Sequence, residues 1–317
     1  MRIANARGKR WKPYTANVRG GLEVKRLLDG APGTPENYLL NVVRSNGSYV
    51  SPRHRHNFDQ VRLVLDGTVC VAPGRDITAG QVGYFPEGTW YGPQDDRGRR
   101  WTIMIVQFGG ASGNGFMSPD EALAAKEGLA REGEFRGGVF RRARGEGRKN
   151  QDAYEATWER FSGRRLVYPP PRYEAPVIVE PDAFGWKPAG AAGVRQRRFG
   201  SFTERETRLA AVRIDAGAGW TSPSRRAVQL HFVLRGEGAC DGAAYHAHAA
   251  VETRPGEQAR FEARTETEIL ILTMPMIGRP HAELDPAGKR FDISRHGLQR
   301  AGDRAARELA HKEPAGA

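Results

Sequence analysis

The stretch SPRHRHNFDQVRLVLDG, residues 51–67, carries the strongest structural signal in this sequence. It holds His54 and His56, two positions apart, and the first 230 residues contain no other histidine. On a β-strand, side chains at positions i, i+2 and i+4 point to the same face, so His54, His56 and Gln60 are expected to project together. Two imidazoles that converge from one strand are what a first-row transition metal needs. The alternative is that chance placed two histidines on a surface or in a core.

Arg62 lies two positions after Gln60 and is expected to share that inward face. A guanidinium beside the site would hold a carboxylate or an enolate of a substrate. The alternative is an arginine that pairs with a neighbouring acid or extends to water. Nearby aromatic side chains are expected either to wall a cavity or to belong to an ordinary core: Phe58, Trp90, Tyr91 and Trp101.

Two long parts of the chain read as β-structure. Short apolar runs separated by Gly, Pro, Asn and Asp predict strands over residues 20–110 and again over 175–280. Two segments, FDQVRLVLDG (58–67) and AVQLHFVLRG (227–236), also resemble each other. Their similarity favours a duplicated all-β domain of the jelly-roll type.

The middle of the chain predicts helices instead. Ser118, followed by Pro119 and Glu121, has the pattern of a helix N-terminus, and the helix should run to about residue 132. A second helix is expected over residues 152–161, where aromatic side chains recur at helical spacing.

A second motif follows the histidine pair. It reads Gly80-x5-Pro86-x-Gly88-x2-Tyr91-x3-Asp95, and the first motif reads His54-x-His56-x3-Gln60-x6-Gly67. Together they resemble the two motifs of the cupin superfamily in their spacing, although the leading glycine, Gly47, is one residue out of place. The phrases PRHRHNFDQVR, GYFPEGTWYGPQ and YPPPRY are similar to an abundant group of bacterial two-cupin (bicupin) proteins. Resemblance to that group implies no particular reaction.

The resemblance implies an all-β fold of two cupin domains (double-stranded β-helix, jelly roll) joined by a helical insert. The expected parts are an N-terminal cupin with the metal-type motifs, a helical insert with a Pro-rich connector, a degenerate C-terminal cupin, and a polar tail with a short helix near residues 303–311. Their expected boundaries are 1–112, 113–172, 173–280 and 281–317.

The sequence departs from the family at two ligand positions. Cupin metals are typically held by three His and one Glu, but here Tyr91 stands for the last His and Gln60 for the Glu. The resemblance therefore implies His54, His56 and Gln60 as metal ligands, with Gln60 alternatively orienting a water molecule. Tyr91 becomes a ligand or a proton donor, and ligation requires its pKa to drop from about 10. Arg62 is expected to neutralise the substrate.

These residues lead to two functional hypotheses. The first is a metal-dependent enzyme that acts on a small, oxygen-rich organic anion. The resemblance favours dioxygenase chemistry, followed by isomerase or decarboxylase chemistry. Iron is the first expectation for its one divalent transition metal, with manganese, nickel, copper and zinc open. The second hypothesis is a non-catalytic small-molecule-binding or sensor cupin that has lost its metal, because the Glu and the last His are missing. A homodimer is expected in either case.

The C-terminal half lacks most of this chemistry. Pro223 and Arg225 stand where the two histidines are expected, Gln229 is retained, and His231 replaces the arginine. A structural or dimer-forming domain is expected, with or without a pocket of its own. The pair at His246 and His248 is expected on a solvated hairpin, or else in a site shared with His231.

Composition excludes several other classes. A chain of 317 residues predicts about two domains, and no run of 18 apolar residues is present to span a membrane. Two cysteines, Cys70 and Cys240, form neither a disulfide framework nor a zinc site, and no secretory signal is evident at the start, so the cytoplasm is expected. The net charge of +12 is scattered along the chain. The basic run 136–149 is therefore expected to be a solvated linker rather than a nucleic-acid site.

Overall fold

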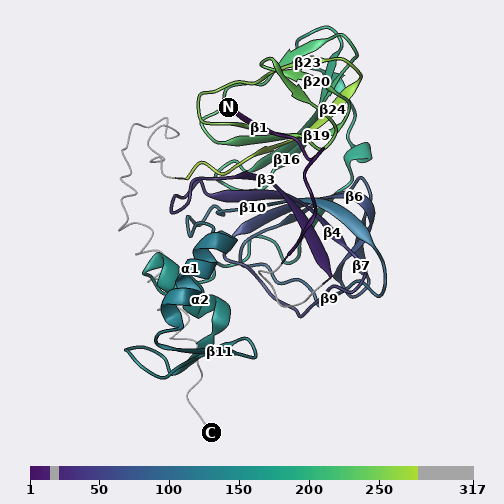
Figure 1. The fold of residues 1–317 in the computed structure, drawn as a ribbon. Coiled ribbons are helices and arrows are strands. Elements are labelled where there is room, and N and C mark those ends of the chain that lie inside the picture. The colour runs from purple at the N-terminus through teal and green to yellow at the C-terminus, as the bar shows by residue number, and fades with distance from the viewer. Residues whose placement is uncertain (15–20, 278–317) are drawn as a thin grey trace. The chain divides into compact units, whose positions relative to one another are not determined.

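A computed structural model describes residues 1–14 and 21–277, and every structural statement below concerns those residues. Antiparallel β-sheet dominates it (Figure 1). One large sheet has the strand order β14-β8-β6-β10-β4-β3-β2, with β7 also paired to β6. The other has the order β1-β22-β19-β24-β17-β16-β15. The predicted all-β fold with a helical insert is confirmed.

The strands of the first large sheet are β2 (Lys12–Pro13), β3 (Leu22–Asp29), β4 (Tyr38–Ser45), β6 (Asp59–Ala72), β7 (Arg75–Thr78), β8 (Val82–Phe85), β10 (Trp101–Phe108) and β14 (Val177–Val179). The strands of the second are β1 (Arg2–Ala4), β15 (Lys187–Pro188), β16 (Val194–Ser201), β17 (Arg208–Ile214), β19 (Gln229–Arg235), β22 (Ala250–Thr253) and β24 (Thr267–Thr273).

Smaller sheets complete the two halves. β5 (Val50–Ser51) pairs with β9 (Gln94–Asp95) in the first half. In the second half a four-stranded sheet contains β18 (Gly219–Thr221), β20 (Gly238–Cys240), β21 (Ala243–Tyr245) and β23 (Arg260–Ala263). A 3-10 turn, η1 (Pro181–Ala183), follows β14.

Strand β6 shows how the sheet sorts its side chains. Val61 and Leu63 belong to an apolar core that contains residues of both large sheets. Gln60 and Arg62 alternate with them and line a cavity on the other face. One face of this strand therefore joins the two halves, while the other faces the interior of the first half.

The first residues of the chain strengthen the link between the halves. Although β1 precedes every strand of the first half, it pairs with β22 in the second sheet. There Arg2 forms an ion pair with Glu252. Tyr38, on β4 of the first sheet, donates to the same carboxylate at 2.5 Å. Both halves thus share one buried carboxylate.

The insert between the halves carries both helices, α1 (Pro119–Leu129) and α2 (Ala153–Ser162), grouped with β11 in Figure 1. Both predicted helices are confirmed, although α1 ends three residues before the expected position. Helix α2 starts at the cap Asp152 and ends at Gly163, whose positive φ suits a glycine.

The basic run 136–149 is mostly exposed to solvent, as predicted, but it is not an unstructured linker. It contributes to a three-stranded sheet of β11 (Gly133–Arg136), β12 (Val139–Arg142) and β13 (Asn150–Asp152). Arg142 forms an ion pair with Glu132, and Arg148 lies 3.2 Å from Glu159. The linker prediction was wrong for the strand residues, because charge density alone does not show that acids of α2 and of the turn after α1 meet these arginines.

The helix start at Ser118 gives a first testable effect. Its hydroxyl accepts from the Glu121 amide, and the Glu121 carboxylate accepts from the Ser118 amide at 2.7 Å, so the capping box is complete. Ser118→Ala is expected to lower the free energy of unfolding by about 1 kcal/mol. Urea denaturation would measure it. Ser162→Ala, at the C-terminal end of the other helix, α2, is the control. An equal loss of stability in both variants would contradict the capping argument.

The interior of the second half is filled with apolar and aromatic side chains. Trp220 stacks on Phe261 at 5.7 Å between ring centres, and His231 lies 5.6 Å from the same ring.

Within the described residues, no helix is long and apolar enough to cross a membrane. The helix expected near residues 303–311 lies outside the described residues.

Candidate functional site

The interior of the first half contains a cavity of about 580 Å³. That volume suits a small organic ligand. All five residues singled out as site residues from the sequence line it: His54, His56, Gln60, Arg62 and Tyr91.

The two histidines precede β6 and do not lie on a regular strand. His54 forms an isolated bridge with Tyr91, in which each backbone amide donates to the other residue's carbonyl at 2.9 and 3.0 Å. The carbonyl of His56 accepts from the amide of Gly88 at 2.8 Å. The expected strand is therefore absent at this point. The two motifs nevertheless pair directly, and that pairing brings the imidazoles beside the phenol.

The two imidazole rings lie close enough together to share one metal ion. Their ring centres lie 5.0 Å apart and their planes are at 84°. An ion about 2.1 Å from each nitrogen lies about 3.2 Å from each ring centre, so rings that meet it at about 100° have centres about 5 Å apart. The Nδ1 of His54 lies 2.7 Å from the Pro52 carbonyl. Because a carbonyl only accepts, Nδ1 carries the proton and the ring's lone pair is on Nε2, as in many metal-bound histidines.

His56 is held in its neutral form. Burial, followed by the nearby His54 and the charge on Arg62, keeps the pKa of His56 well below 6.5. Its ring lies 4.4 Å from Phe58. A neutral imidazole keeps a lone pair for coordination.

Gln60, Arg62 and Tyr91 form a hydrogen-bonded triangle. Arg62 donates to the Gln60 carbonyl oxygen from Nε at 3.1 Å and from Nη2 at 2.9 Å. Nη2 also donates to the Tyr91 hydroxyl at 3.1 Å, and the Gln60 amide nitrogen lies 3.4 Å from it. Burial raises the pKa of Tyr91 to about 12 despite Arg62, so its hydroxyl keeps its proton.

This donor set fits a divalent metal through two imidazoles, not through four protein ligands. The Gln60 oxygen is engaged by Arg62, and Tyr91 is a neutral phenol. Within residues 1–14 and 21–277, no three His, Cys, Asp or Glu side chains gather into a metal cluster. An ion at the histidine pair would therefore keep several positions for water or substrate.

Arg62 is a buried charge without a protein counter-charge. It is 8% exposed, and its guanidinium lies 4.1 Å from the centre of the Phe85 ring. Its hydrogen-bond partners are neutral, and no ion pair involves it in the described part of the chain. Because buried charges are normally paired, this cavity favours an anion.

Two further arginines line the same cavity and were not recognised from the sequence. The guanidinium of Arg55 lies 4.9 Å from the Trp90 ring centre and 4.2 Å from that of Tyr168. Arg53 also lies over Trp90, at 5.1 Å. The alternation of Arg and His in PRHRH was an available signal for the arginines, but nothing local places Tyr168 beside them.

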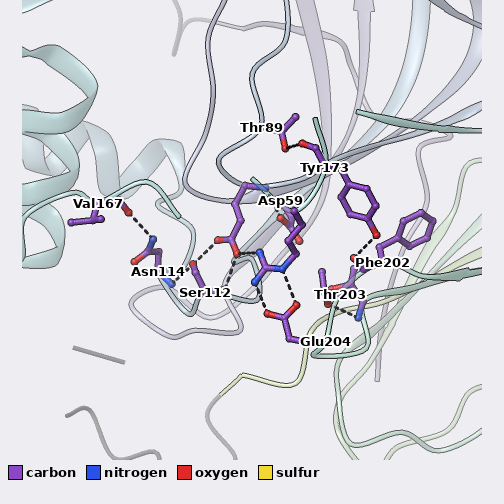
Figure 2. Close-up of polar contacts among 12 residues, drawn as sticks. Asp59, Thr89, Ser112, Asn114, Val167, Tyr173, Phe202, Thr203 and Glu204 are labelled. Atoms are coloured by element: carbon purple, nitrogen blue, oxygen red, sulfur yellow. Dashed lines mark hydrogen bonds and ion pairs between the residues drawn. The ribbon is translucent and has the colours of Figure 1, made fainter. Parts of the chain in front are cut away.

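Outside the cavity lining, a polar network connects the first half to the insert and to the second half (Figure 2). Asp59 accepts from the Tyr84 hydroxyl at 2.7 Å and from the Glu87 amide at 2.8 Å. Burial beside Glu87 raises the pKa of Asp59 to about 7. Glu87 in turn accepts from the Ser112 amide at 2.7 Å.

Arg172 provides the positive charge of this network. It donates to Glu87 at 2.8 Å and to Glu204 of the second half at 2.8 Å. Gly88, next to Glu87, has no room for a Cβ, which would lie 2.2 Å from the Pro169 carbonyl oxygen. The network thus fixes the loop after β8, which contains Glu87, Gly88 and Tyr91. It supports the cavity wall without touching the cavity.

The equivalent positions of the second half form no comparable cluster in the described residues. Gln229 donates to the Pro223 carbonyl at 2.9 Å. The Nδ1 of His246 lies 3.2 Å from Glu237, whereas His248 stacks on Phe232 at 5.8 Å. The hairpin pair is therefore divided between two different environments.

Comparison with known proteins finds similarity to solved structures only. No family model matches the sequence, and no curated protein matches it. Among solved structures, Streptomyces albus HEPD with 2-hydroxyethylphosphonate and Fe(II) bound is similar at a TM-score of 0.54 and 13% identity, over 95% of this chain and 81% of that one. A Pseudomonas aeruginosa protein described as glyoxylate-induced is similar at 0.52 and 11% identity, over 82% of each chain.

The fold and the cavity together define a double-barrel β-protein with a ligand-sized cavity in its first barrel. The barrel fold is the cupin fold, present twice in one chain. Identities this low establish the fold alone, and many activities occur on it.

Proposed function

We propose that the first barrel is the site of a metal-dependent enzyme that acts on a small organic anion. The observation that carries the proposal is the perpendicular pair of imidazoles, 5.0 Å apart, in a cavity that also holds an uncompensated guanidinium. The imidazoles supply neutral ligands, and the guanidinium favours an anionic substrate beside them.

Each residue has a distinct part in this proposal. His54 and His56 hold one divalent transition metal, with iron expected first. Arg62 binds the carboxylate or enolate of the substrate. Gln60 positions Arg62 through its carbonyl oxygen, and the Tyr91 hydroxyl, within 3.1 Å of Arg62, offers a proton at the same place. The bound metal would act as a Lewis acid and a template for the substrate.

For the reaction, a dioxygenase-type step is the first hypothesis, with isomerase or decarboxylase chemistry next. The HEPD structure contains Fe(II) and a small phosphonate, which agrees with iron and an anion as first choices. That likeness is one of fold, so metal and substrate remain proposals for this chain.

One observation favours the second candidate, a non-catalytic small-molecule-binding cupin without metal. The Gln60 carbonyl oxygen, the third candidate ligand, accepts two hydrogen bonds from Arg62. A positive charge so near the histidine pair opposes a dication unless an anionic ligand binds with it.

Metal content decides between the two candidates. Protein purified and then reconstituted anaerobically with Fe(II), Mn(II), Ni(II), Cu(II) or Zn(II), one metal at a time, is expected to retain about one equivalent of at least one metal per chain. His56→Ala should retain less than about a tenth, because one imidazole binds weakly. His246→Ala, in the second barrel, is the matched control and should retain metal as the wild type does. Wild-type protein that holds less than about a tenth of an equivalent of each metal would favour the binding protein instead.

A further inference from the structure

We propose that the cavity has a second anion subsite at Arg55, and that its ligand is therefore an organic dianion with an apolar body. The inference rests on the proposed function for its first anion, which binds at Arg62. It adds a second charge at a different place and so defines the substrate class.

Arg55 is a half-buried guanidinium that lies over two aromatic rings. Its central carbon lies 4.2 Å from the Tyr168 ring centre and 4.9 Å from that of Trp90. A guanidinium that stacks on aromatic faces keeps its N–H groups at the edge of the plane, where they form the fork that binds a carboxylate or phosphate. The rings thus fix the donors in place before a ligand arrives.

No protein carboxylate uses those donors. In the part of the chain that the structure describes, neither Arg53 nor Arg55 forms an ion pair, although this protein's arginines commonly do. Two acids also line the cavity, but both are engaged. Asp152 caps helix α2 through the Tyr154 amide at 2.9 Å, and Glu155 lies 3.4 Å from Arg148. The lining holds three guanidiniums against these two carboxylates, and Glu155 is paired with Arg148 outside it, so the cavity keeps a net positive charge.

The two charged places differ in depth. Arg62 is 8% exposed, Arg55 is half-buried, and Trp90 beside it is 42% exposed. A ligand that reaches both arginines extends from the interior of the barrel toward solvent. The cavity is large enough for such a molecule, at about 580 Å³.

The rest of the cavity lining indicates the chemistry of the part of the ligand that would join its two anionic groups. Val43, Ile103 and Ile105 line the cavity with apolar surface. Two of the lining residues, Asn41 and Gln94, each have a buried amide oxygen without a hydrogen-bond partner among the described residues. The orientation of Gln94 is fixed because its amide nitrogen donates to the Cys70 carbonyl at 2.7 Å. An amide oxygen only accepts hydrogen bonds, so a water molecule or a hydroxyl group, and not a carboxylate, would satisfy each of these two.

Paired probes test the second subsite directly. Calorimetric titration of the full chain would compare dicarboxylates from succinate to suberate with monocarboxylates of equal carbon number. At the best-fitting length, the dicarboxylate is expected to bind at least about tenfold more tightly. Arg55→Gln should reduce its affinity to that of the monocarboxylate while leaving the monocarboxylate unchanged. Arg97→Gln, an exposed arginine on the same barrel and outside the cavity, should change neither.

The outcomes separate this inference from the proposed function. Equal binding of both acids, a dicarboxylate preference that survives in Arg55→Gln, or no binding of any probe at 10 mM would each overturn the second subsite. Arg62→Gln should weaken both acids, which checks the first anion site. A dicarboxylate preference that requires Arg55 in a protein without metal would support the second subsite while contradicting the metal-dependent enzyme.

Discussion

Arg172→Met is expected to lower the free energy of unfolding by about 3 kcal/mol. Glu87, its main partner, is fully buried, and Asp59 lies beside it. Removal of the guanidinium leaves this buried pair of acids without a cation, and an unpaired buried charge costs far more than an exposed pair contributes. Urea denaturation at pH 7 would measure the loss.

Two further variants identify the cause. Glu204→Gln removes only the exposed arm of the network and should cost no more than about 1 kcal/mol, because solvent screens that ion pair. Adding Glu87→Gln to Arg172→Met should restore more than about 1 kcal/mol, since the uncompensated charge is then gone. A stability of Arg172→Met within about 1 kcal/mol of the wild type would contradict the importance of the network.

His231→Leu is expected to remove a marked pH dependence of stability. His231 is fully buried beside Trp220 and Phe261, and this burial lowers its pKa to about 4. The unfolded chain takes up a proton on this ring below about pH 6.5, whereas the folded protein does so only near pH 4. Its contribution is therefore complete above about pH 6.5 and is lost as the pH falls toward 4. Between pH 7 and pH 5 the loss amounts to about 2 kcal/mol.

Leucine has nearly the volume of histidine and does not titrate. At pH 7 the variant should match the wild type within about 1 kcal/mol. Between pH 7 and pH 5 the free energy of unfolding of the variant should rise by about 2 kcal/mol relative to that of the wild type. All other titrating groups are common to both proteins, so the difference isolates His231. Parallel stability curves from pH 7 to pH 5 would contradict the burial of a neutral imidazole.

Local patterns predicted several elements correctly because their causes are local. Ser118 and Glu121 satisfy each other's amides within one turn, so the helix start is visible in four residues. Likewise, Gln60 and Arg62 share a face because strand periodicity alone requires it.

Other expectations depended on partners far away in the sequence. His54 and His56 converge through a bridge to Tyr91 rather than through strand geometry. Gln60 was predicted as a metal ligand, and this stays a prediction, although its oxygen is engaged by Arg62. No local pattern distinguishes an amide oxygen that points toward a cavity from one that accepts from a neighbouring guanidinium.

The sequence by itself determined the all-β class, the two helix starts and the residues that share the cavity, since periodicity, capping and motif spacing act over a few residues. Only the tertiary structure decided how those residues are paired. The placement of Arg55 against Tyr168, and of Arg172 between Glu87 and Glu204, joins segments between 32 and 113 residues apart. Charge compensation depends on distance in space, and that distance is set by packing rather than by any neighbouring residue.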